Sequence, residues 1–141
     1  MTVGLNAPSQ TQLDTLLEHY QNKRYGDAEK LAISITKQFP GHQFSWKVLG
    51  AVFKLKGMKV ESLKANQRAV QLIPQDAAAH NNLGVALKEL GRFEEAEASY
   101  NQAIAVKSDF AEAHCNLGNM LQKLGRLEES EANYNQAIAV K

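Results

Sequence analysis

Apolar and polar residues along this chain follow the period of an α-helix, and they do so in paired segments. One apolar face consists of His80, Leu83, Gly84 and Leu87, at i, i+3, i+4 and i+7, and the next consists of Phe93, Ala96, Tyr100, Ala103 and Ile104. Gly91 lies between them, and glycine suits the left-handed residue that ends a helix. The pattern therefore predicts two antiparallel helices joined by a short turn, and it indicates no credible strand.

This pair of helices is repeated every 34 residues along the chain. Aligned without a gap, residues 77–107 and 111–141 are identical at 22 of 31 positions, and both segments end in YNQAIAVK. The period extends backwards through equivalent small residues and prolines. It divides the chain into an N-terminal extension and four units, at 1–8, 9–42, 43–76, 77–110 and 111–141, of which the last lacks its final three residues.

A single unit cannot bury both faces of its helix hairpin, so neighbouring units must stack in a line. Small residues at Gly84 and Ala96 allow the two helices of a hairpin to approach closely. Asp76 and Asp109 precede the next first helix, where a side-chain oxygen can cap free backbone N–H groups. These features predict an all-α, single-domain stack of antiparallel helix hairpins.

The second unit contains the pattern W-x2-LG-x2-F at Trp46–Phe53, followed by small residues and Pro74. With its length of 34 residues, the unit resembles the tetratricopeptide repeat, and the resemblance covers residues 9–141. The resemblance implies a right-handed α-solenoid. The first unit is atypical, because Leu16 occupies the glycine position and Ala32 the aromatic position.

A stack of this kind turns the first helix of each hairpin toward a concave groove, which suits an extended peptide or a partner helix. The groove-facing residues are those of the first helices that packing does not use. We expect them to include Lys47, Lys54, Asn81, Asn82, Val85, Lys88, Glu112, Asn116, Asn119 and Lys123. Charges of both signs occur in this set, so it does not indicate the charge of a ligand.

Asn82 and Asn116 are equivalent residues of successive units. A side-chain amide donates and accepts, so a row of them can pair with a peptide backbone whatever its sequence. The row is similar to the asparagine ladder in the tetratricopeptide arm of O-linked N-acetylglucosamine transferases. The last two units resemble that arm, and also bacterial enzymes in which repeats precede a transferase domain. Val48 and Asp14 interrupt the ladder, and exposed asparagines often have no binding role.

A carboxylate clamp, by which similar modules hold chaperone C-termini, is an alternative for the groove. The clamp would require a Lys and an Asn from one unit, an Asn from the next unit, and a Lys and an Arg from the unit after that. Lys47 and Asn82 match this requirement. The other positions hold Ala51, Glu112 and Asn116, so most of the charge assistance for a carboxylate is missing and the clamp is rejected.

No motif in the sequence indicates catalysis. HExxH, CxxC and GxSxG patterns are absent, and Cys115 is the only cysteine. His80 and His114 occupy the position of Trp46 on the buried face, so we expect packing residues whose ring nitrogens bond to backbone, rather than metal ligands. The chain is predicted not to be an enzyme and to have no catalytic, cofactor-binding or metal-binding residues.

The composition indicates neither nucleic acid nor a membrane interior as a partner. The 16 Lys and Arg nearly balance the 15 Asp and Glu, and no basic stripe indicates nucleic acid. The apolar runs are far shorter than the ~20 residues that cross a bilayer, so no membrane insertion is expected. The first residues lack the order of a secretory signal, and a cytoplasmic location is the default expectation.

These patterns predict a non-catalytic protein-interaction module that binds an extended peptide or a partner helix in its groove. The module is expected to be the N-terminal part of a longer repeat protein. One alternative is a structural scaffold that self-assembles through its repeat ends, and another is the substrate-recognition arm of a transferase whose catalytic domain is absent. Because no polar capping helix follows the last unit, we also expect self-association through the C-terminal hairpin.

Overall fold

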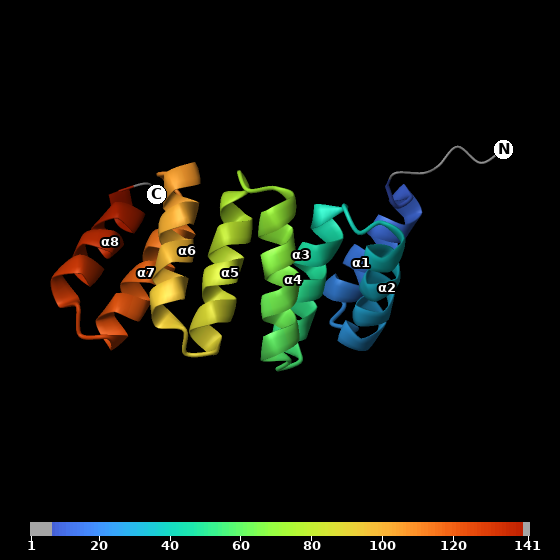
Figure 1. Cartoon of the computed structure of the whole chain (residues 1–141), viewed down its shortest axis with the longest axis horizontal. Coiled ribbons are helices and arrows are strands. Elements are labelled where there is room, and N and C mark those ends of the chain that lie inside the picture. The colour runs from blue at the N-terminus through green and yellow to red at the C-terminus, as the bar shows by residue number, and fades with distance from the viewer. Residues whose placement is uncertain (1–6, 140–141) are drawn as a thin grey trace. The chain divides into compact units, whose positions relative to one another are not determined.

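A computed structural model describes residues 7–139, and this range contains eight α-helices and no strand (Figure 1). The helices are α1 (Gln10–Gln21), α2 (Tyr25–Gln38), α3 (Gln43–Leu55), α4 (Lys59–Leu72), α5 (Ala77–Glu89), α6 (Phe93–Val106), α7 (Ala111–Lys123) and α8 (Leu127–Ala139). Each predicted unit forms one hairpin of two helices. Of the predicted extension at 1–8, only Ala7 and Pro8 lie within the described range.

The helices group into two compact units. The first unit ends at Leu72 and the second begins at Ile73, close to the boundary between the second and third repeats. In the first unit, α2 packs against α1 and α3, and α3 packs against α4. In the second unit, α6 packs against α5 and α7, α7 packs against α8, and the first helices α5 and α7 are also in contact. No helix among residues 7–139 is long and apolar enough to cross a membrane.

Each hairpin turns at a residue with positive φ. Gly57, Gly91 and Gly125 have φ values of 76°, 74° and 79°, which glycine adopts without a steric penalty. This confirms the prediction that a glycine ends the first helix. The first hairpin has Lys23 at the equivalent position, with φ of 60°, a conformation that costs a residue with a side chain more than it costs glycine.

The two helices of a hairpin meet where a glycine of the first helix faces a larger side chain of the second. A Cβ atom on the glycine would lie 2.8 Å from Asn66 Oδ1 at Gly50, 2.6 Å from Tyr100 Cε1 at Gly84, and 3.0 Å from Tyr134 Cε1 at Gly118. At Gly50 and Gly84 such distances leave no room for a methyl group unless the facing side chain moves, and at Gly118 the fit would be tight. Hydroxyl groups reinforce two of these contacts, because Ser62 and Ser130 each donate a 2.8 Å hydrogen bond to the facing glycine carbonyl.

The atypical first hairpin keeps one large and one small residue at this contact, but on opposite helices. Leu16 replaces the glycine and Ala32 replaces the aromatic residue, and both have 0% exposure within the same apolar cluster. The cluster also contains Ile35, Val52 and Phe53. The exchange of large and small residues explains how this hairpin forms without the glycine.

One of the two predicted helix caps is correct. Asp76 caps α5, because its carboxylate accepts the backbone N–H of Ala79 at 3.2 Å. The prediction for Asp109 is wrong, because α7 begins at Ala111 and its N-cap is therefore Phe110, which makes no side-chain cap. Asp109 lies one residue too early to reach the free N–H groups of that helix.

Replacing Gly84 with alanine should destabilise the second unit by about 1–3 kcal/mol, because the new methyl group would overlap the fully buried ring of Tyr100. Gly118→Ala is the matched comparison, since its methyl group would meet the partly exposed ring of Tyr134, which has room to shift. Urea unfolding of both variants measures the difference. Equal losses of unfolding free energy would contradict this account of the contact.

Candidate functional site

One aromatic position recurs at the start of three first helices and is structural. The ring N–H groups of Trp46, His80 and His114 bond to the backbone carbonyls of Pro40, Pro74 and Ser108 at 2.9, 2.7 and 2.9 Å. These carbonyls are themselves equivalent in the repeat. The prediction that both histidines pack and bond to backbone is thus confirmed. Within residues 7–139, no group of three or more His, Cys, Asp or Glu side chains could hold a metal ion.

The predicted groove residues lie on three first helices, in two units. Lys47 and Lys54 are on α3, and the eight others are on α5 and α7 of the second unit: Asn81, Asn82, Val85, Lys88, Glu112, Asn116, Asn119 and Lys123. Because α5 packs against α7, the second unit brings its eight residues onto adjacent helices. Seven of them are partly or fully exposed, and we call these seven the first-helix face.

Asn81 is the exception. The prediction that it lines an open groove is wrong, because its side chain is only 1% exposed and cannot meet a ligand. Its amide oxygen instead accepts a 3.0 Å hydrogen bond from Nδ2 of Asn116. A signal for this burial existed in the repeat, since the equivalent residue of the next unit is Cys115, a residue type that is usually buried.

The hydrogen bond from Asn116 to Asn81 leaves part of the Asn116 amide for a ligand. One N–H group of Asn116 is used, and its oxygen and second N–H group have no partner in the described chain. Asn82, one repeat earlier, makes no side-chain hydrogen bond within residues 7–139 and is half-buried. The two asparagines are therefore on adjacent helices, and each has unused hydrogen-bonding capacity.

Asn119 differs from these two asparagines, because a side chain of α8 is already within hydrogen-bond distance of its amide oxygen. The hydroxyl of Tyr134 is within hydrogen-bond distance of the Asn119 amide oxygen and lies 3.0 Å from that of Gln122. A phenol has one proton to donate, so it bonds to one of these oxygens at a time. A ligand at Asn119 would compete with this internal contact.

Tyr100 occupies the same repeat position as Tyr134, but its hydroxyl has no partner. The side chain is 0% exposed and the hydroxyl is a buried, unbonded group. The residues equivalent to Asn119 and Gln122 are Val85 and Lys88, and neither side chain can accept a hydrogen bond. Burial raises the pKa of the phenol well above its usual value, and the negative charge of Glu89 raises it further.

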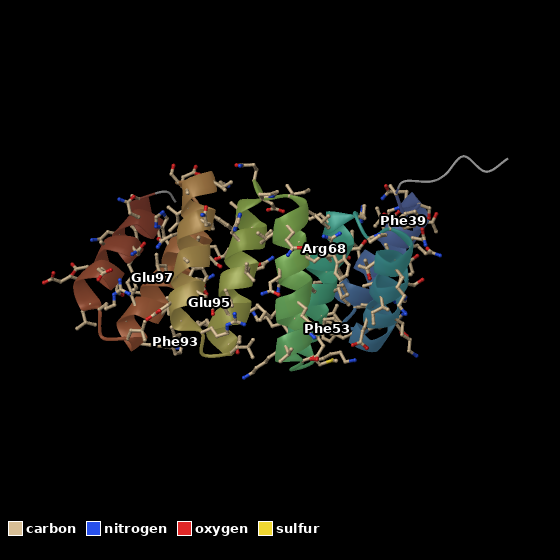
Figure 2. All side chains as sticks on the ribbon, in the orientation of Figure 1. Phe39, Phe53, Arg68, Phe93, Glu95 and Glu97 are labelled. Atoms are coloured by element: carbon tan, nitrogen blue, oxygen red, sulfur yellow. The ribbon has the colours of Figure 1, made fainter. Side chains whose placement is uncertain are left out.

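Ion pairs surround a surface hollow of about 520 Å³ on the second unit, beside the turns of its hairpins. Figure 2 shows Phe93, Glu95 and Glu97 in succession along α6 from the turn. Glu95 pairs with Arg92 at 2.6 Å, and Glu97 pairs with Arg126 at 2.8 Å. The Arg92 guanidinium lowers the pKa of the Glu95 carboxyl through its hydrogen bond. These charged groups satisfy one another, so the hollow presents no unpaired charge from these four residues to a ligand.

Three family models match the chain. One, described as TPR repeat, matches residues 86–125, and two, described as tetratricopeptide repeat, match residues 60–105 and 111–141. Together the matches run from residue 60 to residue 141, more than half of the sequence. No curated protein sequence matches the chain significantly.

Solved structures share the fold at low sequence identity. A crystal structure of MamA has a TM-score of 0.87 and 21% identity, and the match covers 93% of this chain and 77% of that chain. A structure of MamA from Desulfovibrio magneticus RS-1, residue 41 to its end, has a TM-score of 0.85 and 18% identity, with 92% and 73% covered. These likenesses confirm the predicted all-α fold of stacked helix hairpins.

The two equivalent tyrosines should respond differently to loss of the hydroxyl. Tyr100→Phe removes a buried, unbonded polar group and should raise the free energy of unfolding by about 1 kcal/mol. Tyr134→Phe removes a hydrogen bond and should lower it by about 0.5–1.5 kcal/mol. Chemical denaturation of both variants, each compared with the unmodified chain, checks the prediction. The same sign for both changes would contradict it.

Proposed function

The chain belongs to the tetratricopeptide repeat family, and on this basis we propose that it is a non-catalytic protein-interaction module that binds an extended peptide or a partner helix. The first-helix face of the second unit is the proposed binding surface. The observation that carries the proposal is the state of Asn82 and Asn116, which lie on adjacent helices with unused hydrogen-bonding groups. Backbone N–H and C=O groups of an extended peptide are suitable partners for such amides.

The bond to Asn81 gives Asn116 a fixed orientation. Because one N–H group of Asn116 is held by a buried acceptor, its oxygen and remaining N–H group keep their directions before a ligand arrives. A group that is already oriented loses less side-chain entropy on binding. Asn81 therefore acts as a positioning residue for Asn116 rather than as a ligand contact.

A self-assembling scaffold is a second candidate, supported by the uncovered face of α8. Positions that α7 covers on α6 are open on α8: Tyr100 is buried where Tyr134 is partly exposed, and Ile104 is partly buried where Ile138 is 70% exposed. An exposed apolar face of this kind favours association with another apolar surface. We propose that this 141-residue polypeptide associates with further copies of itself through α8.

The peptide-binding proposal predicts an effect that does not depend on peptide side chains. Asn82→Ala combined with Asn116→Ala should weaken the binding of extended peptides selected from a random library. The loss of binding free energy should be about 1–3 kcal/mol, because each lost hydrogen bond contributes about 0.5–1.5 kcal/mol. Fluorescence anisotropy titrations measure the loss. Asn101→Ala with Asn135→Ala, on the exposed surface of the second helices, is the matched control and should leave affinity unchanged. Unchanged affinity in the first variant would reject the asparagine row as a peptide-binding site.

The scaffold proposal predicts association that depends on concentration. Light scattering across a concentration series should show a molar mass that rises above that of the monomer. Ile138→Lys should abolish the rise, because it places a charge on the uncovered face. Ala132→Lys is the matched control, since its repeat equivalent Ala98 is exposed even where α7 covers α6. A monomer at every concentration, or equal effects of both substitutions, would exclude α8 as the interface.

A further inference from the structure

The turn between α3 and α4 departs from the pattern of the two turns that follow it. Residues 54–61 read KLKGMKVE, whereas the equivalent segments read KELGRFEE at 88–95 and QKLGRLEE at 122–129. Apolar and charged positions are exchanged. Leu55 and Val60 stand where the next unit has Glu89 and Glu94, and Lys59 stands where that unit has Phe93. The exchange leaves the turn both basic and apolar at its surface.

The structure places these unusual residues on the outside. Leu55 is 51% exposed and Val60 is 50% exposed, and Lys54 and Lys59 are exposed beside them. Neither lysine has a carboxylate partner in the described chain. The two hairpin turns that follow this one along the chain differ, because Arg92 and Arg126 pair there with glutamates three residues later. Met58 replaces that arginine in the unusual turn, so the internal ion pair of the repeat is lost.

A second basic turn lies at the same edge of the first unit. The turns between α1 and α2 and between α3 and α4 are at the same ends of their hairpins (Figure 1). A 3.0 Å ion pair between Lys56 and Glu29 connects the second turn to α2. Lys23 and Arg24 form the first turn and are exposed. We call the exposed residues of the two turns the basic-apolar edge: Lys23, Arg24, Lys54, Leu55, Lys59 and Val60.

The charge of the whole first unit agrees with that of its edge. Residues 1–72 contain 10 Lys and Arg against 5 Asp and Glu, while residues 73–141 contain 6 against 10. The balanced net charge of +1 therefore conceals a basic first unit and an acidic second unit. A partner of the basic-apolar edge must be anionic and must also accept Leu55 and Val60.

We propose that the basic-apolar edge docks onto the surface of an anionic lipid membrane. Lysine and arginine keep their charged ends among the lipid headgroups while their apolar stems lie deeper. Leu55 and Val60 then enter the boundary between headgroups and acyl chains, as apolar side chains of peripheral membrane proteins do. Each cation near an anionic surface adds about 1 kcal/mol, or about fivefold in partitioning. The contact is peripheral and requires no helix to cross the bilayer.

A membrane fits this edge better than an acidic peptide does. The apolar residues flank the tip of a turn, and a peptide ligand usually needs a groove or a hollow to receive its side chains. A protruding turn can enter a fluid headgroup layer, which adapts to its shape.

Vesicle sedimentation tests the proposal with the full 141-residue chain. The chain should bind vesicles of phosphatidylcholine with phosphatidylserine, should not bind phosphatidylcholine alone, and should bind more weakly at higher salt, because salt screens exposed charges. Arg24→Gln with Lys59→Gln should reduce partitioning about 25-fold, as two cations are lost. Leu55→Glu with Val60→Glu should abolish binding. That variant copies the residues of the next repeat, so the hairpin should still fold.

Lys37→Gln with Arg68→Gln is the matched control for net charge. Lys37 is in the last turn of α2, and Figure 2 shows Arg68 on α4 away from the turn, so neither belongs to the edge. This control should reduce partitioning less than threefold. Equal losses in the two charge variants would overturn the proposal, and so would absence of binding to phosphatidylserine vesicles. If Leu55→Glu with Val60→Glu leaves vesicle binding unchanged but alters self-association, the edge is a protein–protein surface and the membrane proposal fails.

Discussion

The close approach of two helices within each hairpin is the contact on which the other features depend. In the last three hairpins a glycine on the first helix faces Asn66, Tyr100 or Tyr134, and at Gly50 and Gly84 a Cβ atom would lie less than 3.0 Å from the facing side chain. Once the pair is closed, its remaining apolar surface lies on the outer sides of the hairpin. The next first helix then covers that surface, as α7 covers α6. The first hairpin shows that the combined volume of the two facing residues matters more than the presence of a glycine. There the large residue, Leu16, is on the first helix and the small residue, Ala32, is on the second.

The sequence predicted these contacts because the residues that make them recur in step with the 34-residue period. The ring N–H to carbonyl bond predicted at His80 and His114 is an example. Trp46 makes the same bond, since the donor and acceptor positions are both in step with the period. The error at Asp109 concerns the first residue of α7, which is Ala111, so that Phe110 is the N-cap. The error at Asn81 has a different cause. Adjacent helix residues point about 100° apart, so the period indicates a face but not what covers its margins. Asn81 is buried while Asn82 is not, and only the position of the neighbouring helix decides between them.

Equivalent positions can share a place in the fold and differ in chemistry. Tyr100 and Tyr134 both face a glycine, yet one hydroxyl is buried without a partner and the other is near two amide oxygens. The difference arises on the first helix, where Val85 and Lys88 replace Asn119 and Gln122. Tyr134 packs at the hairpin contact and also occupies an amide oxygen on the first helix, whereas Tyr100 packs in the same way and occupies none. The period alone could not predict this coupling, because it depends on which neighbouring residues can accept a proton.

The residues that pack a hairpin and the residues exposed on its surface are different, so one repeat can carry several surfaces. Residues at the hairpin contact are fixed by volume, and the turn glycine is favoured by its positive φ. Exposed residues on the turns have neither constraint, so KLKGMKVE and KELGRFEE can close the same kind of hairpin. A change there alters charge and exposed apolar area with little effect on packing. The first-helix face and the basic-apolar edge lie on different residues, so binding at one does not require the residues of the other. Lys54, which the sequence assigns to the groove, belongs to the basic-apolar edge and not to the first-helix face.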